Sequence, residues 1–103
     1  MSVDHVRQKL WEAMNSLVSD GSIQDRLAYA AGSLVQLSPK ELDLLPDDLR
    51  KRFDTVTDSL TKHPAERTGE GSTQASARKI GSEEGTRLAR EIVSIYIAMR
   101  GTN

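Results

Sequence analysis

The chain has 103 residues, of which 37% are hydrophobic and 28% are charged, and its 14 basic and 15 acidic side chains give a net charge of -1. This length predicts a single domain, and the balanced charge excludes a global field that would gather nucleic acid or an anionic membrane. The chain has no cysteine, which excludes disulfides, zinc-thiolate clusters and thiol nucleophiles. No stretch has the apolar length of a secretion signal or a membrane span, so we expect a cytoplasmic protein without a membrane partner.

The first two segments carry apolar residues at helical spacing. The first follows Ser2, an N-cap residue, and stops at Asp20-Gly21, and the second follows Ser22 with Asp25 in its first turn. Both are expected to be amphipathic helices. The first stripe consists of Val3, Val6, Leu10, Ala13, Met14 and Leu17, and the second of Ile23, Leu27, Ala30, Leu34 and Leu37.

Two more helix starts follow closely in the sequence. SPKE at 38–41 combines a serine cap, a proline suited to the first helical position and a glutamate that completes a capping box, which predicts a short helix. Pro46 then opens a longer helix with Asp47 and Asp48 in its first turn, ending at His63-Pro64. The expected buried stripe of this helix is Leu49, Phe53, Val56 and Leu60.

A polar stretch, TGEGSTQASARKIGSEEG at 68–85, separates this helix from the next. It does not fit a phosphate-binding loop, because Lys79 is followed by Ile80 rather than serine or threonine and a helix precedes the stretch. We expect a mobile loop over about 64–81, since Ile80 is its only large apolar side chain. A loop ordered by a partner and a small-molecule site are the alternatives.

The last helix is expected to be capped by Ser82 and to run to Gly101. Its segment IVSIYI would also suit a strand, but the surrounding helix formers and the cap favour a helix. The sequence therefore predicts an all-α bundle of four main helices plus one short helix, with a long polar loop before the last helix. Residues 1–103 form one helical domain in this prediction.

Candidate catalytic groups are scarce. His5 and His63 are far apart in sequence, and we expect neither to form a catalytic pair with a serine or carboxylate. Pro64 also breaks the geometry that would make His63 and Glu66 a metal-binding pair. We therefore expect no catalytic, cofactor-binding or metal-binding residues, and a protein that is not an enzyme. A small helical hydrolase or nuclease with an unrecognised site is an alternative.

A local basic patch of Arg50, Arg52, Arg78 and Lys79 gives a second alternative, contact with nucleic acid. Arg50 and Arg52 share their helix with four aspartates, so pairing at spacings of three and four explains them more simply. No helix-turn-helix is evident, since Arg26 is the only basic residue of the second helix. Nucleic acid is thus the weaker hypothesis for a partner.

Two features indicate how helices pack. Ala28 and Gly32 leave a strip of the second helix almost without side chains, which predicts the close approach of another helix. Trp11 lies beside the main stripe of the first helix, near Met14 and Val18, and is either at the edge of the core or in an interface.

The last helix has a broad apolar surface. Its core stripe of Leu88, Ile92, Ile95 and Met99 continues through Ala89, Val93, Tyr96 and Ile97 to cover roughly 200°. A surface helix needs a narrower stripe, so we expect a homodimer or another protein partner, with Val93, Tyr96, Ile97 and Trp11 in the interface. The predicted function is a small non-catalytic interaction or regulatory protein, such as an accessory factor, inhibitor, antitoxin or immunity factor.

Overall fold

A computed structural model describes residues 3–63 and 71–100 of the chain. Its helices, in chain order, are α1 (Asp4–Leu17), α2 (Ile23–Leu34), α3 (Pro39–Leu42), α4 (Asp47–Thr61), α5 (Ser72–Arg78) and α6 (Ser82–Arg100). No strand occurs within the described residues, which confirms the expected all-α fold. The described residues form four long helices, as expected, but two short ones instead of one.

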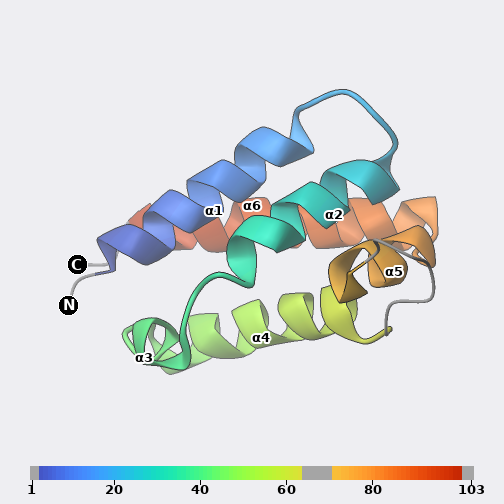
Figure 1. The fold of residues 1–103 in the computed structure, drawn as a ribbon. Helices are drawn as coiled ribbons and strands as arrows, with labels where there is room; N and C mark the ends of the chain where they lie inside the picture. Colours follow the sequence, from blue (N-terminus) through green and yellow to red (C-terminus); the bar gives the residue numbers. More distant parts are fainter. Residues whose placement is uncertain (1–2, 64–70, 101–103) are drawn as a thin grey trace.

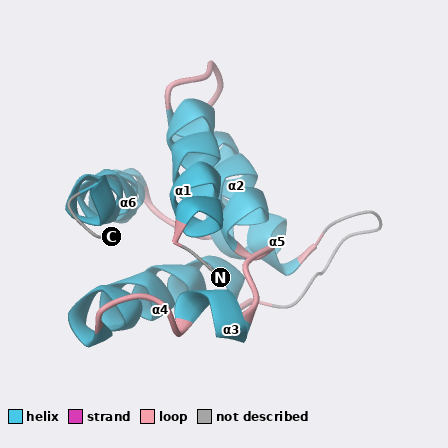
Figure 2. Ribbon diagram, turned by 90° about the vertical axis from the view of Figure 1, so that its left-hand side faces the viewer, coloured by secondary structure: helices cyan, strands magenta, loops and turns pink. Residues whose placement is uncertain are grey.

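The long helices form a bundle in which α6 packs against three others, α1, α2 and α4 (Figure 1). α1 and α2 are an antiparallel pair, and Figure 2 shows this pair above α4 with α6 beside both. The turn between α1 and α2 contains Gly21 at a φ of 109°, a left-handed conformation that favours glycine. Asp20-Gly21 therefore marks the turn after α1, although the helix itself ends three residues earlier, at Leu17.

The core lies between the four long helices, and the predicted apolar stripes supply most of it. All four residues of the expected α4 stripe are buried, with exposed fractions of 5% or less. Met14 and Ile23 are the exceptions among the stripe residues, because both are only half-buried. The core side chains with 0 to 1% exposure on the other long helices are Val6, Leu10, Ala13, Leu27, Ala30, Ala31, Leu34, Leu88, Ile92, Ile95 and Met99.

Two of the predicted helix starts have the expected caps. The Ser22 hydroxyl accepts a hydrogen bond from the Asp25 amide at 3.0 Å. At α3, the Ser38 hydroxyl accepts from the Glu41 amide at 3.3 Å, and the Glu41 carboxylate accepts from the Ser38 amide at 3.2 Å. These reciprocal bonds complete the capping box that the sequence predicted.

The starts of α1 and α6 differ from the prediction. Val3 is the N-cap of α1 and forms no side-chain capping bond, whereas Ser2 lies outside the described residues. Ser82 is the first helical residue of α6 rather than its cap, because the Gly81 carbonyl already accepts a bond from the Gly85 amide at 2.8 Å. Gly101, the expected end of this helix, also lies outside the described residues.

The loop expected over 64–81 is wrong for its second half, which contains helix α5. Residues 64–70 lie outside the described residues. α5 packs against α2 and α4, and Ala75, Ser76 and Ala77 are at most 1% exposed. Small side chains bury little apolar area each, but they let a short helix approach its neighbours closely. The expectation failed because it counted only large apolar residues as able to hold the segment.

The close helix approach expected at Ala28 and Gly32 is wrong for Gly32, and another glycine allows such an approach, while half-buried Ala28 packs against the core. A Cβ added to Gly32 would meet nothing within 4 Å. A Cβ added to Gly85 would instead lie 3.1 Å from Ile23 Cγ1 and 3.2 Å from Leu27 Cδ1. Gly85 is therefore the residue that allows α6 to lie directly against the start of α2.

Candidate functional site

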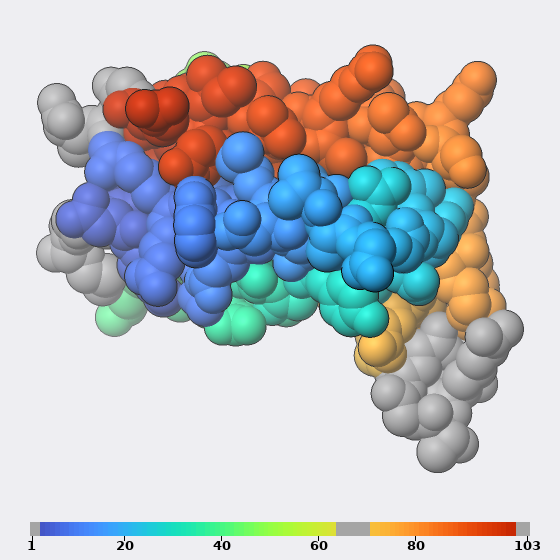
Figure 3. All heavy atoms as spheres, turned by 90° about the horizontal axis from the view of Figure 1, so that it is seen from above, coloured from blue at the N-terminus to red at the C-terminus, as the bar shows by residue number. Residues whose placement is uncertain are grey.

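An apolar surface lies where α1 and α6 run side by side. Trp11 on α1 is 55% exposed, Val18 directly after α1 is 81% exposed, and Ile97 on α6 is 63% exposed. Half-buried Met14 and Val93 lie on the same sides of their helices by helical spacing. We name the surface of Trp11, Met14, Val18, Val93 and Ile97 the α1/α6 face. Figure 3 looks onto this side of the molecule, with α1 in blue and α6 in red.

The orientation of α1 follows from one hydrogen bond to α6. Arg7 Nε donates to the Met99 carbonyl at 3.1 Å, so the side of α1 that carries Arg7 adjoins α6. Trp11, Met14 and Val18 follow Arg7 at spacings of four, seven and eleven residues, which places them along the same side. Their side chains therefore border the seam with α6 rather than the opposite seam with α2.

A hollow of about 230 Å³ interrupts the seam near the end of α1. Leu17, Ile23, Ala89 and Val93 form its apolar walls, with Thr86 and Arg90 at the rim. Ile97 lies one turn beyond Val93 on α6, toward the end of the seam that holds Arg7. The α1/α6 face thus combines exposed large side chains with an apolar hollow of side-chain size.

The broad apolar surface of α6, from which a protein partner was expected, is partly covered by neighbouring helices. Ala89, Val93 and Tyr96 are half-buried and pack against the core, because α6 has neighbours on three sides. The sequence argument treated this helix as a surface helix, for which a narrower apolar stripe is enough. Among the α6 residues predicted for the interface, Ile97 alone is largely exposed. The case for a partner therefore depends on Ile97, Trp11 and their surroundings.

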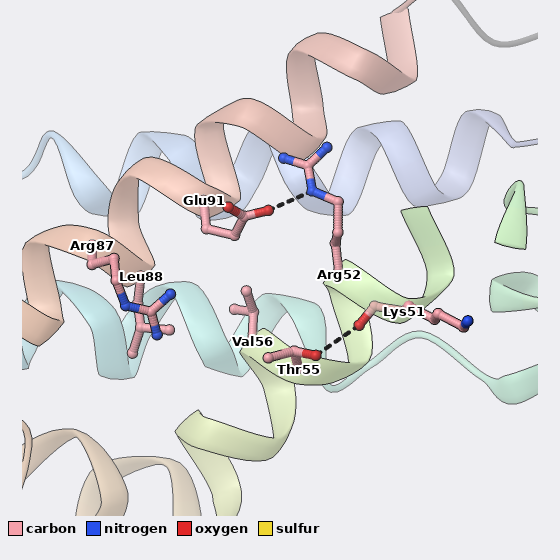
Figure 4. A pocket seen from close by; sticks show the side chains of 7 residues that line it. All are labelled: Lys51, Arg52, Thr55, Val56, Arg87, Leu88 and Glu91. Carbon is pink, nitrogen blue, oxygen red and sulfur yellow. Dashed lines mark hydrogen bonds and ion pairs between the residues drawn. The ribbon is translucent and has the colours of Figure 1, made fainter. Parts of the chain in front are cut away.

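A second depression, of about 360 Å³, lies between α4 and α6 (Figure 4). Val56 and Leu88 close its floor and are only 2% and 0% exposed, so the aliphatic stems of longer side chains supply most of its apolar walls. Three cationic side chains and one carboxylate line this α4–α6 groove, together with Thr55. The charged residues are Lys51, Arg52, Arg87 and Glu91.

The arginines of the α4–α6 groove are held in place by neighbouring polar groups. Arg52 donates from Nε to Glu91 at 2.5 Å and from Nη2 to the Ser94 hydroxyl at 2.7 Å, which joins α4 to α6. Arg87 donates from Nε and Nη2 to Glu84 at 2.9 and 2.5 Å. This pairing lowers the pKa of Glu84 and raises the pKa of Arg87. Within the described residues, Lys51 forms no ion pair.

The predicted basic patch is divided between the two ends of α4. Arg50 pairs with Asp43 at 2.7 Å and with Asp54 at 3.1 Å, and the bond to Asp43 is the main cause of its raised pKa. Arg78 and Lys79 belong to the α5 region, which packs at the other end of α4 from α3 (Figure 1). The four residues therefore do not form one continuous surface for a phosphate backbone.

The two histidines have separate surroundings. His5 Nδ1 contacts the Glu41 carboxylate, which links α1 to α3, and this contact is the main cause of the lowered pKa of Glu41. His63 follows α4, and its backbone amide donates to the buried Ser76 hydroxyl at 2.8 Å. Within residues 3–63 and 71–100, no three His, Asp or Glu side chains gather in a way that would hold a metal ion.

The sequence prediction missed the α4–α6 groove. Arg87 and Glu91 stand four residues apart on one side of α6, as do Lys51 and Thr55 on α4, and this spacing was a usable signal. It did not reveal that the two helices would be neighbours, because Arg52 and Glu91 are 39 residues apart in the chain.

Among the described helices, none has the length and apolar character required to cross a membrane. No protein-family model, curated protein or solved structure matches the chain.

Proposed function

We infer that this protein is a non-catalytic interaction protein, and that its α1/α6 face binds a second copy of the chain. The observation that carries this proposal is the exposure of Trp11, Val18 and Ile97 along one seam, beside an apolar hollow. Full burial of an isoleucine contributes about 1.5–3 kcal/mol, so covering the 63% exposed Ile97 side chain contributes about 1–2 kcal/mol. Tryptophan is also among the residues most enriched at the centres of interfaces.

The α1/α6 face has a shape that suits a second copy. The protruding Ile97 lies toward the Arg7 end of the seam, whereas the hollow lies toward Leu17 at the other end. A two-fold axis passing between them, close to Trp11, would bring Ile97 of each copy over the hollow of the other. A closed, isologous dimer requires such a self-complementary patch. The two Trp11 side chains would then lie near the axis, where central hot spots are found.

An accessory, inhibitory, antitoxin or immunity role, and the cytoplasmic location expected from composition, are hypotheses about where the interaction is used. Contact with nucleic acid is less well supported, since Arg50 and Arg52 are paired with carboxylates and lie apart from Arg78 and Lys79.

Sedimentation velocity over a range of micromolar concentrations tests the proposal. The wild type should sediment as a dimer that dissociates on dilution, and Ile97→Glu should be a folded monomer, because Ile97 is already 63% exposed in the single chain. Tyr29→Glu is the matched control, since Tyr29 is 62% exposed on α2 and should leave the dimer intact. A wild type that stays monomeric over the whole range would contradict self-association.

Crosslinking locates the interface independently. The chain has no cysteine, so single-cysteine variants report one position each. Asn15→Cys lies on the exposed side of α1 near Trp11 and should crosslink efficiently with a short bismaleimide. Lys40→Cys, on exposed α3, should not. Equal crosslinking of the two variants would indicate random collision rather than a two-fold contact at this face.

A further inference from the structure

The charged side chains that line the α4–α6 groove keep hydrogen-bond donors that the contacts described above do not occupy. The groove is lined by three cationic side chains, Lys51, Arg52 and Arg87, and by one carboxylate, that of Glu91. Arg52 and Arg87 each use Nε and Nη2 in their described bonds, and a guanidinium has five N–H donors, so each retains donors at Nη1. Figure 4 shows the cationic side chains around the groove, with Val56 and Leu88 between the two helices.

We propose that the α4–α6 groove binds an acidic segment of a partner protein. Carboxylates of the segment would meet Lys51 and Arg87, and an apolar side chain such as leucine between them would rest on the aliphatic stems of the groove. The argument for this occupant is charge complementarity, since three cations and one anion line the groove, and positive charge still exceeds negative when Glu84, the partner of Arg87, is counted. The groove is an open channel between two helices rather than an enclosed cavity, which suits a peptide segment better than a small free ligand.

Glu91 has a specific role in this proposal. Its carboxylate already forms an ion pair with Arg52 Nε at 2.5 Å. It would also place a negative charge beside any incoming carboxylate. Neutralising Glu91 should therefore strengthen binding, whereas neutralising Lys51 should weaken it. Opposite effects from two side chains of the same groove distinguish electrostatic recognition from a general effect of disturbing its shape.

The proposal does not depend on self-association. Arg87 and Glu91 lie roughly 100° around α6 from Ile97, so the groove and the α1/α6 face occupy different sides of the helix. The Ile97→Glu monomer should consequently bind an acidic peptide as well as the wild type does. Failure of the groove experiment would leave the proposed dimer untouched, and the reverse also holds.

The test is a titration of the isotope-labelled protein followed by amide chemical shifts. The probe is a synthetic peptide of leucine and glutamate residues, and its control has glutamine in place of every glutamate. We expect saturable shift changes over Lys51–Val56 and Arg87–Glu91 with the acidic peptide and not with the control. Lys51→Gln should weaken binding about two- to five-fold and Glu91→Gln should strengthen it by a similar factor, as for exposed charge pairs.

Lys40→Gln is the matched control, because it removes the same charge from exposed α3 and should leave the affinity unchanged. Thermal melts of each variant identify any loss of folding. The proposal is overturned by shift changes outside the groove, by equal binding of the glutamine peptide, or by no response at millimolar peptide. Tighter binding of a random DNA duplex at the same residues would also overturn it.

Discussion

Replacing Gly85 with alanine tests how closely α6 and α2 approach each other. Alanine favours a helix interior by about 1 kcal/mol over glycine, so the substitution should stabilise the protein wherever a methyl group has room. At Gly85 the methyl group would lie 3.1 Å from Ile23 Cγ1 and 3.2 Å from Leu27 Cδ1. Leu27 is 0% exposed and belongs to the close-packed core, whereas half-buried Ile23 lines the hollow and can shift toward it.

The two effects have opposite signs and known sizes. Overpacking a core with one methyl group costs about 1–3 kcal/mol. Set against the helix preference of about 1 kcal/mol, this gives a net destabilisation of about 0–2 kcal/mol for Gly85→Ala. Gly32→Ala is the matched control, because its methyl group would meet nothing within 4 Å and should stabilise by about 0.4–1 kcal/mol.

Urea denaturation followed by circular dichroism measures both variants against the wild type. The free energy of unfolding should be lower for Gly85→Ala than for Gly32→Ala, with no change in the slope against denaturant. The experiment should be done on the Ile97→Glu background if the wild type is a dimer, so that unfolding is not coupled to dissociation. Equal stabilisation by the two alanines would refute the close contact at Gly85.

Two other predictions concern contacts between helices. Ser76→Ala should destabilise the protein by about 1–3 kcal/mol, because it removes the buried partner of the His63 amide, and hydrogen exchange should show faster opening of α5 than in the wild type. Glu41 has a pKa below its ordinary value of 4.5, mainly because of its contact with His5 and then because of the Ser38 amide. Its contribution to stability is therefore present above pH 4.5 and is lost as the pH falls through the lowered folded-state pKa. The melting temperature of Glu41→Gln should be below that of the wild type near neutral pH, and the difference should shrink in acid. A difference independent of pH would show that Glu41 acts through its shape alone.

The features that the sequence predicted correctly depend on neighbouring residues. Ser22 and Ser38 cap their helices through amides three residues away, and Gly21 forms part of the turn after α1 through its own left-handed backbone conformation. Such local contacts can be recognised before the tertiary fold is known. The apolar stripe of α4 was equally predictable, because helical spacing alone brings its members to one side.

The features that were missed depend on helices distant in sequence. Gly32 and Gly85 look alike in a helical segment, but only Gly85 faces another helix at close range. Val93 and Tyr96 were expected in an interface, yet three neighbouring helices around α6 bury much of their surface. The exposure of Ile97 and the pairing of Arg52 with Glu91 depend on the same packing of helices around α6. The apolar periodicity of each helix does not reveal this packing.

The position of α6 determines the order in which the bundle can be completed during synthesis. α1 and α2 are adjacent in the chain and can pair early, but the Arg7 bond to the Met99 carbonyl joins residues 92 positions apart. Because α6 supplies a wall to α1, α2 and α4, their apolar stripes stay incompletely covered until Leu88, Ile92, Ile95 and Met99 have left the ribosome. Apolar surface on α1, α2 and α4 thus stays exposed until α6 has been synthesised, and the docking of α6 covers it.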